Sequence, residues 1–204
     1  MISFQKRFLF VHIPKTAGNS IQSVLRNYSE DEIVSSRRYQ DGIERFGVRS
    51  ADSTLKKHSS LAEYRTALGE EQFHELYKFT CVRNPWDRLI SYYFGTGDQT
   101  AKWDREVFEG LVLRTLSAAD YLRLEEGEKD PFGNLNRVIR FETLTEDFRA
   151  LCADLDIPVA TLPEYNRSQR ESYPQYYDDK LRALVAERFA PEIERFGYTF
   201  EGGR

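Results

Sequence analysis

The sequence predicts an α/β protein of three layers, with helices on both faces of a central, mainly parallel sheet. Near residue 8 a short apolar run leads through a tight turn into a pattern of helical period, and the same order returns near residue 77. A third apolar run, again followed by a helical pattern, starts near residue 137. Short, continuous apolar runs are typical of buried parallel strands, so we place all three in one sheet.

The first unit begins with "RFLFVHI", Arg7–Ile13, which we predict to be a buried strand. The turn "PKTAG" follows it. Beyond the turn, apolar side chains recur at the spacing of one helix face: Ile21, Val24, Leu25 and Tyr28. The polar segment Ser29–His58 has little periodicity, and we expect a loop with short elements there.

The second unit is preceded by a helix within Ser59–Tyr77. Ser59 or Ser60 can cap this helix, and Glu63 is placed to complete a capping box. "YKFTCVR", Tyr77–Arg83, is then expected to form the second buried strand.

The helix after the second strand carries clear signals at both ends. Asn84 is a suitable N-cap, and Pro85 fits the first helical position. We expect Gly95 and Gly97 to end the helix. Its apolar face comprises Trp86, Leu89, Ile90 and Tyr93, for which we expect core packing.

The remaining chain supplies more helix and the third strand. Thr100–Gly133 is amphipathic and mostly helical in pattern. Arg137–Phe141 is expected to be a strand, and Thr143 with Glu146 to form a capping box for the next helix. Pro158–Tyr177 is a long polar and aromatic loop, a type that in compact domains is often functional.

Composition limits the class of protein. A length of 204 residues without a linker predicts one domain, residues 1–204. A net charge of −4 argues against a protein that coats nucleic acid. Cys81 and Cys152 lie in apolar elements, so we expect two buried, reduced thiols and no metal site. Neither a membrane span nor a signal peptide is visible, which predicts a cytoplasmic protein unless an anchor has been removed.

The first turn is rich in groups that can face an anion. The first N–H groups of a helix are unpaired and its macrodipole is positive there, and Gly18 lets a phosphate approach the backbone closely. Lys15 adds a mobile cation, and Thr16, Asn19 and Ser20 add donors. The turn lacks the order of a Walker A loop, because its glycine follows the lysine. A simple helix cap beside a solvated lysine is the alternative.

The second turn strengthens the case for an anion site. In open α/β sheets, ligands bind at the carboxyl ends of the strands, so Arg83 is expected to point into the same crevice as the first turn. With Ser91, two turns into the helix, Arg83 can clamp a second phosphate. For Arg88 we expect a surface ion pair.

Together, "FVHIPKTAGNS" and "FTCVRNPWDRLISYY" closely resemble sulfotransferase family 2, which includes carbohydrate sulfotransferases such as the heparan sulfate 2-O-sulfotransferase group. The likeness extends to "VIRFETLTEDF" and "IERFGYTF", and so covers nearly the whole chain. It implies a sulfotransferase fold similar to P-loop NTPases. It also implies 3′-phosphoadenosine 5′-phosphosulfate (PAPS) as donor, without a metal.

The resemblance assigns roles to individual residues. It implies that the 5′-phosphosulfate is held by Lys15, Thr16, Ala17, Gly18, Asn19 and Ser20. It implies that Arg83 and Ser91 bind the 3′-phosphate. The family commonly has threonine where this chain has Asn19, which affects fine positioning. A segment covering the nucleotide is expected at Asn166, Arg167, Ser168 and Arg170.

Catalysis is expected to involve Lys15 at the leaving oxygen and a general base for the acceptor hydroxyl. Related enzymes often carry a histidine between the two phosphate motifs, and we select His58, with Glu63 as the second candidate. Nearby lysines favour a neutral His58 by lowering its pKa. His12 is expected to support the turn, and His74 to be exposed. A surface or capping role for His58 is the alternative.

Three functions therefore remain in view. The first is a PAPS-dependent sulfotransferase acting on a hydroxyl, for which a carbohydrate is the preferred acceptor. The second is a small-molecule kinase, although the chain shows neither Mg²⁺ ligands nor a full glycine-rich loop. The third is a nucleotide-binding protein without catalysis. The basic stretch Arg37–Lys57 and the aromatic loop can line a saccharide site.

Overall fold

The computed structural model describes residues 1–38, 44–49, 54–96, 102–163 and 170–202. Its main sheet has four strands in the order β1-β2-β5-β6. The three predicted strands are β2 (Phe8–Val11), β5 (Tyr77–Val82) and β6 (Arg137–Arg140), and they run parallel to one another. The antiparallel edge strand β1 (Ile2–Ser3) was not predicted, because two residues are too few to show a period.

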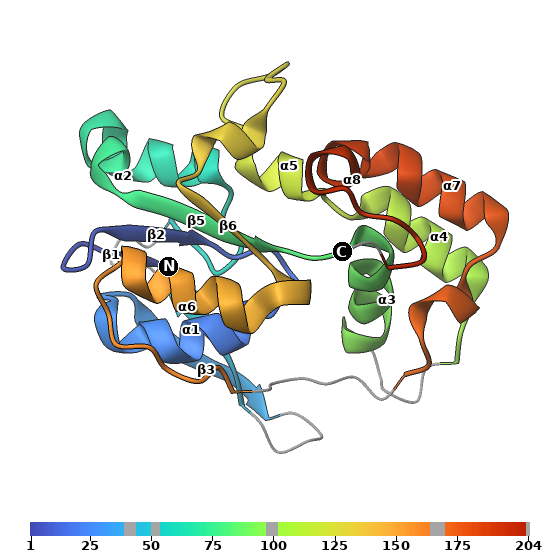
Figure 1. The fold of residues 1–204 in the computed structure, drawn as a ribbon, viewed down its shortest axis with the longest axis horizontal. Coiled ribbons are helices and arrows are strands. Elements are labelled where there is room, and N and C mark those ends of the chain that lie inside the picture. Colours follow the sequence, from blue (N-terminus) through green and yellow to red (C-terminus); the bar gives the residue numbers. More distant parts are fainter. Residues whose placement is uncertain (39–43, 50–53, 97–101, 164–169, 203–204) are drawn as a thin grey trace.

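Helices cover both faces of this sheet, which confirms the α/β prediction (Figure 1). Helix α1 (Gly18–Leu25) and helix α6 (Leu144–Asp154) lie on one face. Helix α2 (Leu61–Glu75) lies on the other face, on the side of α5 (Ala118–Leu122). Each face has its own apolar core: Phe8 and Phe10 of β2 pack toward α1 and α6, and Leu9 and Val11 join the other core. This alternation along one strand shows that β2 is buried on both sides.

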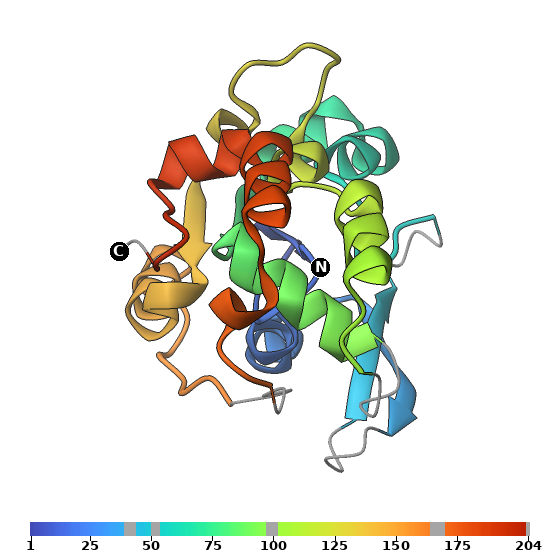
Figure 2. The same ribbon diagram turned by 90° about the vertical axis from the view of Figure 1, so that its right-hand side faces the viewer.

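Four helices gather at the end of the sheet where β2 and β5 finish (Figures 1 and 2). They are α3 (Pro85–Thr96), α4 (Arg105–Arg114), α7 (Asp179–Arg188) and α8 (Ala190–Phe196). Asn84 caps α3 as predicted, because its Oδ1 accepts the N–H of Trp86 at 3.1 Å. Helix α3 is described as far as Thr96, so Gly95 lies in its last turn as expected, and Gly97 lies outside the described residues.

Two capping predictions have opposite outcomes. Ser60 and Glu63 form the predicted capping box of α2. Thr143 and Glu146 form none at α6, because the Thr143 hydroxyl donates to Asp147 Oδ2 at 2.9 Å instead. Asp147 also accepts the N–H of Arg140 at 2.8 Å. This carboxylate therefore links the end of β6 to the helix that follows.

Two further predictions from the sequence are wrong. Within the expected loop Ser29–His58, strands β3 (Glu32–Arg38) and β4 (Glu44–Arg49) form an antiparallel hairpin. Arg88, expected in a surface ion pair, has a side chain only 2% exposed, and it pairs with the equally buried Glu192. A buried charge requires such a partner, so Arg88 belongs to the interior of the helical end.

Candidate functional site

A cleft of about 790 Å³ lies at the carboxyl ends of β2 and β5. Nine of the predicted site residues line it: Lys15, Ala17, Gly18, Asn19, Ser20, His58, Arg83, Ser91 and Arg170. Thr16 does not line the cleft. Asn166, Arg167 and Ser168 lie outside the described residues. The topology therefore brings the two turns together, as the rule for open sheets predicts.

The first turn has an unusual backbone. Lys15 and Ala17 have φ of 70° and 67°, in the left-handed region that residues other than glycine seldom adopt. Between them, the buried Thr16 donates its hydroxyl to the carbonyl of Ile13 at 2.8 Å. Thr16 therefore holds the turn together from inside. Ala17 occupies the N-cap of α1 without a side-chain cap, which leaves the first N–H groups of the helix without a side-chain acceptor.

Gly18 allows the side chain of His12 to lie directly against the backbone of the turn. Its own φ is not positive, in contrast to those of Lys15 and Ala17. A Cβ at Gly18 would lie 2.0 Å from Nε2 of His12, whose ring is buried beneath the turn. The glycine therefore allows the histidine to support the turn, as we expected of His12.

Lys15 reaches across the cleft toward α3. A Cβ at Gly95 would lie 2.0 Å from Nζ of Lys15, so the ammonium group occupies the space that the glycine leaves open. This contact accounts for a glycine in the last turn of α3, because a larger residue there would displace the ammonium group. The position of the catalytic candidate thus depends on both turn and helix.

Arg83 joins the two turns directly. Its Nη1 donates to the carbonyl oxygen of Lys15 at 3.1 Å, and its Nε donates to Asp87 Oδ2 at 2.7 Å. Its guanidinium also lies 3.9 Å from the centre of the Phe141 ring. Asp87 forms a second ion pair, with Arg170. The predicted 3′-phosphate site therefore consists of two arginines around one carboxylate, with the buried hydroxyl-bearing Ser91 on the same helix.

His58 contacts His12, directly after β2, through a hydrogen bond and through its ring, whose centre lies 4.6 Å from that of the His12 ring. Its Nδ1 lies 2.8 Å from the carbonyl oxygen of His12. Because a carbonyl only accepts, Nδ1 must carry the proton, and a neutral ring then has its lone pair on Nε2. Burial and the neighbouring Lys57 lower the pKa of His58 to about 4, although the contact with His12 opposes this. The ring lines the cleft, so a neutral His58 presents a proton acceptor there.

Glu63 is placed differently. Its carboxylate accepts the backbone N–H of Ser60 at 2.6 Å, and it does not line the cleft. His74 is exposed on α2, with 73% of its side chain accessible. Of the two candidates for the base, His58 lines the cleft and Glu63 does not; His12 also lines the cleft, but its ring is buried beneath the turn.

The lining of the cleft has an excess of positive charge, although the protein as a whole is acidic. The lining includes four lysines and arginines against two carboxylates: Lys15, Lys57, Arg83 and Arg170 against Asp87 and Glu171. This excess of positive charge suits a ligand with several negative charges. In the part of the chain that the structure describes, no group of three or more His, Cys, Asp or Glu residues is arranged to hold a metal ion.

Sequence reasoning missed Asp87 and Phe141, and it included Lys57 only as part of a basic stretch for a saccharide site. Lys57 donates to Asn19 Oδ1 at 2.6 Å and so ties the His58 segment to α1. Asp87 and Phe141 shape the surroundings of Arg83. The position of Asp87, four residues after Arg83, could have signalled an ion pair. Lys57 and Phe141 reach the cleft only through tertiary packing.

The comparisons with known proteins were made on the whole chain. A family model described as "Sulfotransferase family" matches residues 1–199. The chain is also similar to a solved structure of a sulfotransferase from Alicyclobacillus acidocaldarius, with 19% identity and a TM-score of 0.38. That match covers 71% of this chain and 60% of the other. No curated protein matches the chain. No helix of the described residues is long and apolar enough to cross a membrane.

Proposed function

The chain belongs to the sulfotransferase family, and from this premise we propose that it transfers a sulfuryl group from PAPS to a hydroxyl acceptor. The observation that carries the proposal is the pairing of two anion-binding turns at adjacent strand ends, joined by the bond from Arg83 to the Lys15 carbonyl. A donor with phosphates at both its 3′ and 5′ positions requires two such sites. The cleft is also large enough, at about 790 Å³, for a nucleotide.

In this proposal each turn has one task. The turn from Lys15 to Ser20 holds the 5′-phosphosulfate with backbone N–H groups and the Asn19 and Ser20 side chains. Arg83 and Ser91 hold the 3′-phosphate, and Arg170 closes the same end of the cleft. Asp87 occupies both arginines in the structure. A phosphate must therefore compete with this carboxylate for the guanidinium groups, which favours a ligand of high charge.

The reaction is an in-line displacement at sulfur. The acceptor oxygen forms a bond to sulfur as the bond from sulfur to the phosphate oxygen breaks, and adenosine 3′,5′-bisphosphate leaves. The ammonium group of Lys15 offsets the charge that grows on the departing oxygen. Nε2 of His58 takes the proton of the acceptor hydroxyl, because its Nδ1 proton is already engaged by His12. The step requires no metal.

We propose a carbohydrate hydroxyl as the acceptor, supported by the aromatic side chains beside the cleft, Tyr92 and Tyr173. Of the basic stretch Arg37–Lys57, the described part contributes Lys57 to the cleft. We further propose that residues 1–204 act as one sulfotransferase domain.

Nucleotide affinity tests the donor assignment before the acceptor is known. We expect Arg83→Ala to weaken adenosine 3′,5′-bisphosphate about 10- to 100-fold, and adenosine 5′-phosphate much less, by calorimetry. Arg105→Ala serves as the control. It removes an arginine of α4 that forms ion pairs with Glu109 and Asp178 away from the cleft. Equal losses for both nucleotides would contradict the assignment of Arg83. Tighter binding of Mg-ATP than of the bisphosphate would favour a kinase.

A transfer assay then tests the reaction itself. Donor labelled with ³⁵S is offered with a set of oligosaccharides and, separately, with tyrosine peptides. We expect label on at least one saccharide and none on the peptides. Bisphosphate binding without transfer to any hydroxyl would instead favour a nucleotide-binding protein without catalysis.

A further inference from the structure

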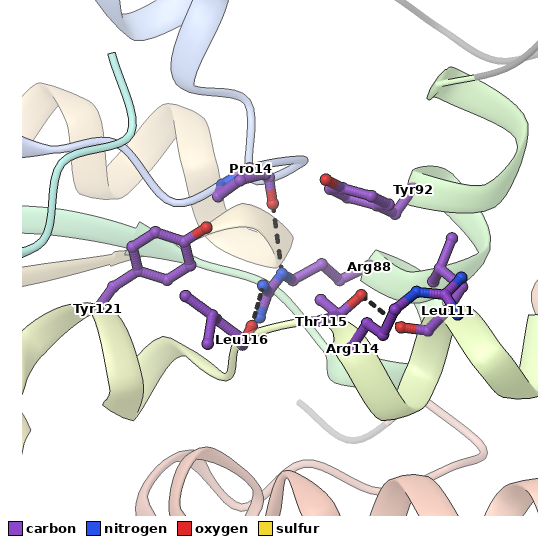
Figure 3. A pocket seen from close by; sticks show the side chains of 8 residues that line it. All are labelled: Pro14, Arg88, Tyr92, Leu111, Arg114, Thr115, Leu116 and Tyr121. Atoms are coloured by element: carbon purple, nitrogen blue, oxygen red, sulfur yellow. Dashed lines mark hydrogen bonds between the residues drawn. The ribbon is translucent and has the colours of Figure 1, made fainter. Parts of the chain in front are cut away.

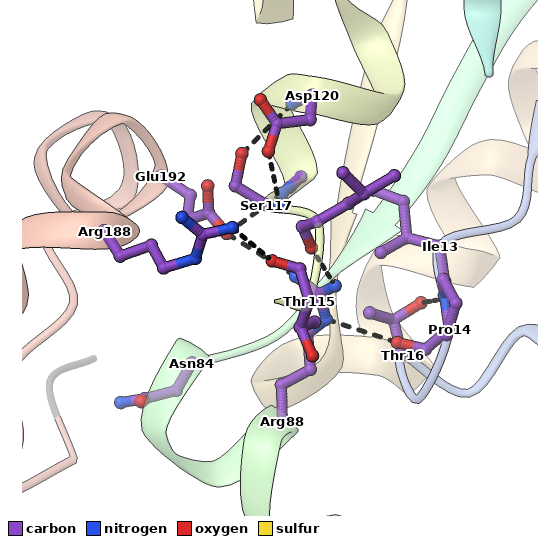
Figure 4. Close-up of polar contacts among 12 residues, drawn as sticks. Ile13, Pro14, Thr16, Asn84, Arg88, Thr115, Ser117, Asp120, Arg188 and Glu192 are labelled. Atoms are coloured by element: carbon purple, nitrogen blue, oxygen red, sulfur yellow. Dashed lines mark hydrogen bonds and ion pairs between the residues drawn. The ribbon is translucent and has the colours of Figure 1, made fainter. Parts of the chain in front are cut away.

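Arg88 joins four segments of the chain through one buried guanidinium (Figure 4). From α3, its Nε lies 3.3 Å from the carbonyl oxygen of Pro14, in the first turn. Its Nη2 donates to the carbonyl of Leu116, between α4 and α5, at 2.6 Å. Its Nη1 lies 3.6 Å from Glu192 Oε1 on α8. Arg88 does not line the donor cleft, so no contact with the donor explains these bonds.

A cavity beside Pro14 makes the bond from Arg88 important for the turn (Figure 3). The cavity measures about 250 Å³, and Arg88 and Pro14 both line it, together with Tyr92 and Tyr121. Where a cavity adjoins the chain, close packing does not hold the backbone in place. The hydrogen bond from Arg88 therefore supplies support to the turn on a side where side chains leave space.

The consequence falls on Lys15. The carbonyl of Pro14 belongs to the peptide unit before Lys15, and the carbonyl of Lys15 belongs to the unit after it. Arg88 holds the first carbonyl and Arg83 the second, at 3.3 and 3.1 Å. The φ of 70° at Lys15 is unfavourable for a residue with a side chain and persists only where its surroundings enforce it. The two arginines fix the peptide units on both sides of this strained residue.

Glu192 keeps Arg88 in this position. Its side chain is 2% exposed, and its Oε1 accepts the N–H of Ala118 at 3.0 Å while facing Arg88. Glu192 therefore faces the buried guanidinium from the side opposite the turn, with its Oε1 at 3.6 Å from Nη1. Glu192 lies on α8, more than a hundred residues further along the chain than the turn that it affects.

We propose that Arg88, held by Glu192, is a positioning residue that fixes the backbone of Lys15 for donor binding. The proposal rests on the proposed function, since it assigns Lys15 to the donor. Arg88 itself does not touch the donor in this scheme. It acts through the Pro14 carbonyl. Its loss is therefore expected to weaken nucleotide affinity only through the changed position of Lys15 and its turn.

A double-mutant cycle on nucleotide affinity separates this role from a merely structural one. Calorimetry measures adenosine 3′,5′-bisphosphate binding to wild type, Arg88→Lys, Lys15→Ala and the double variant, all at a temperature where each is folded. Arg88→Lys keeps the charge, but an ammonium group lacks the planar set of N–H donors with which the guanidinium contacts both carbonyls and Glu192. We expect affinity about 10-fold weaker for Arg88→Lys, the scale of one charged hydrogen bond. We expect the double variant to be within about twofold of Lys15→Ala.

Arg188→Lys is the matched control. Arg188 also donates to backbone carbonyls of the same segment, those of Val112 at 2.9 Å and Thr115 at 3.4 Å, but it has no contact with Pro14. We expect this variant to lose thermal stability and to keep wild-type affinity for the nucleotide. If Arg88→Lys also keeps wild-type affinity, or if its effect adds fully to that of Lys15→Ala, the positioning role is overturned.

Two further outcomes are informative. If Arg88→Lys does not fold, Glu192→Gln takes its place in the cycle, because glutamine keeps the oxygen that accepts from Ala118 and replaces the titratable carboxyl group that faces Arg88. The same loss and the same non-additivity are expected. If wild type fails to bind the bisphosphate, the proposed function and the positioning role both fail. If wild type binds and the cycle is additive, only the positioning role fails.

Discussion

At the scale of single residues, one backbone carbonyl determines what His58 can do. The His12 carbonyl accepts from Nδ1 of His58, which leaves Nε2 to accept a proton in the cleft. We therefore expect His58→Ala to reduce sulfuryl transfer about 10²- to 10⁴-fold, the usual contribution of a general base. Adenosine 3′,5′-bisphosphate affinity should stay near that of wild type. His74→Ala, an exposed histidine on α2, is the control. Loss of nucleotide binding with loss of transfer would contradict the assigned role.

The same environment predicts the pH dependence of the reaction. A base must be neutral to accept a proton, and the pKa of His58 is lowered from 6.5 to about 4, mainly by burial. Falling pH therefore protonates His58 only below the ordinary range of histidine. We expect kcat/KM to keep its plateau through pH 6.5 and to fall at lower pH. If kcat/KM already falls at or above pH 6.5, either another group is the base or the pKa of His58 is not lowered.

Single residues also show where sequence reasoning stops. The turn was predicted as an anion site from residue types alone, and Lys15, Asn19 and Ser20 do line the cleft. Gly18 was singled out for the close approach of a phosphate, and the structure shows a second reason for a glycine there, the ring of His12 beneath it. Arg88 was predicted at the surface because charged side chains seldom lie inside. Its partner Glu192 is far away in the sequence, so no local pattern could reveal the buried pair.

At the scale of elements, α3 combines two requirements that a single substitution can separate. Gly95→Ala should leave helix stability unchanged or raise it by less than the roughly 1 kcal/mol of a helix interior, because Gly95 is the second-last residue of α3. The new Cβ would lie 2.0 Å from Nζ of Lys15, so the flexible lysine side chain must move. We expect an unchanged or higher Tm together with transfer about 10-fold slower or more. Calorimetric melting and the transfer assay measure the two effects.

Gly110→Ala is the control for this prediction. Gly110 lies inside α4. A Cβ there would lie 3.1 Å from Nη1 of the exposed Arg114, and it would not meet Lys15. The variant gains helix propensity and should keep full transfer. If Gly95→Ala also keeps full transfer, then the observed place of the Lys15 ammonium group does not matter for the reaction.

Elements with strong local signals were predicted well, and elements that depend on a partner were not. Strands β2, β5 and β6 are continuous apolar runs, and the caps of α2 and α3 follow from local chemistry. Where β3 and β4 form a hairpin, only a loop with short elements was expected. Ile33 and Val48 of these strands join the core on the α1 face, but the pairing of two strands is not visible in the periodicity of either one.

At the scale of the whole molecule, the layered architecture and the place of the cleft followed from the order of strands, turns and helices. Parallel strands with helices between them bring their carboxyl ends to one edge, which is where Lys15 and Arg83 meet. The gathering of α3, α4, α7 and α8 beside that edge was not predicted. Its packing depends on contacts between distant segments, among which the bond of Arg88 to Leu116 and its pair with Glu192 are examples.

This helical end should give the protein a measurable dependence of stability on pH. Burial raises the pKa of Glu192 from 4.5 to about 7, despite the opposing effect of Arg88. The folded state then holds a proton at pH values where the unfolded chain has released it. The contribution of Glu192 to folding is therefore fully present below pH 4.5 and is lost as the pH rises toward about 7. Its upper bound is on the order of 3 kcal/mol.

Glu192→Gln removes this titration while keeping an oxygen for the N–H of Ala118. The buried histidines oppose the trend: the pKa of His12 is lowered, so His12 costs stability as the pH falls below its ordinary range. The difference between variant and wild type cancels that term and isolates Glu192. We expect the free energy of unfolding of Glu192→Gln, relative to wild type, to rise between pH 5 and pH 8 in urea titrations. A difference that stays constant with pH would show that Glu192 is charged throughout, held so by Arg88.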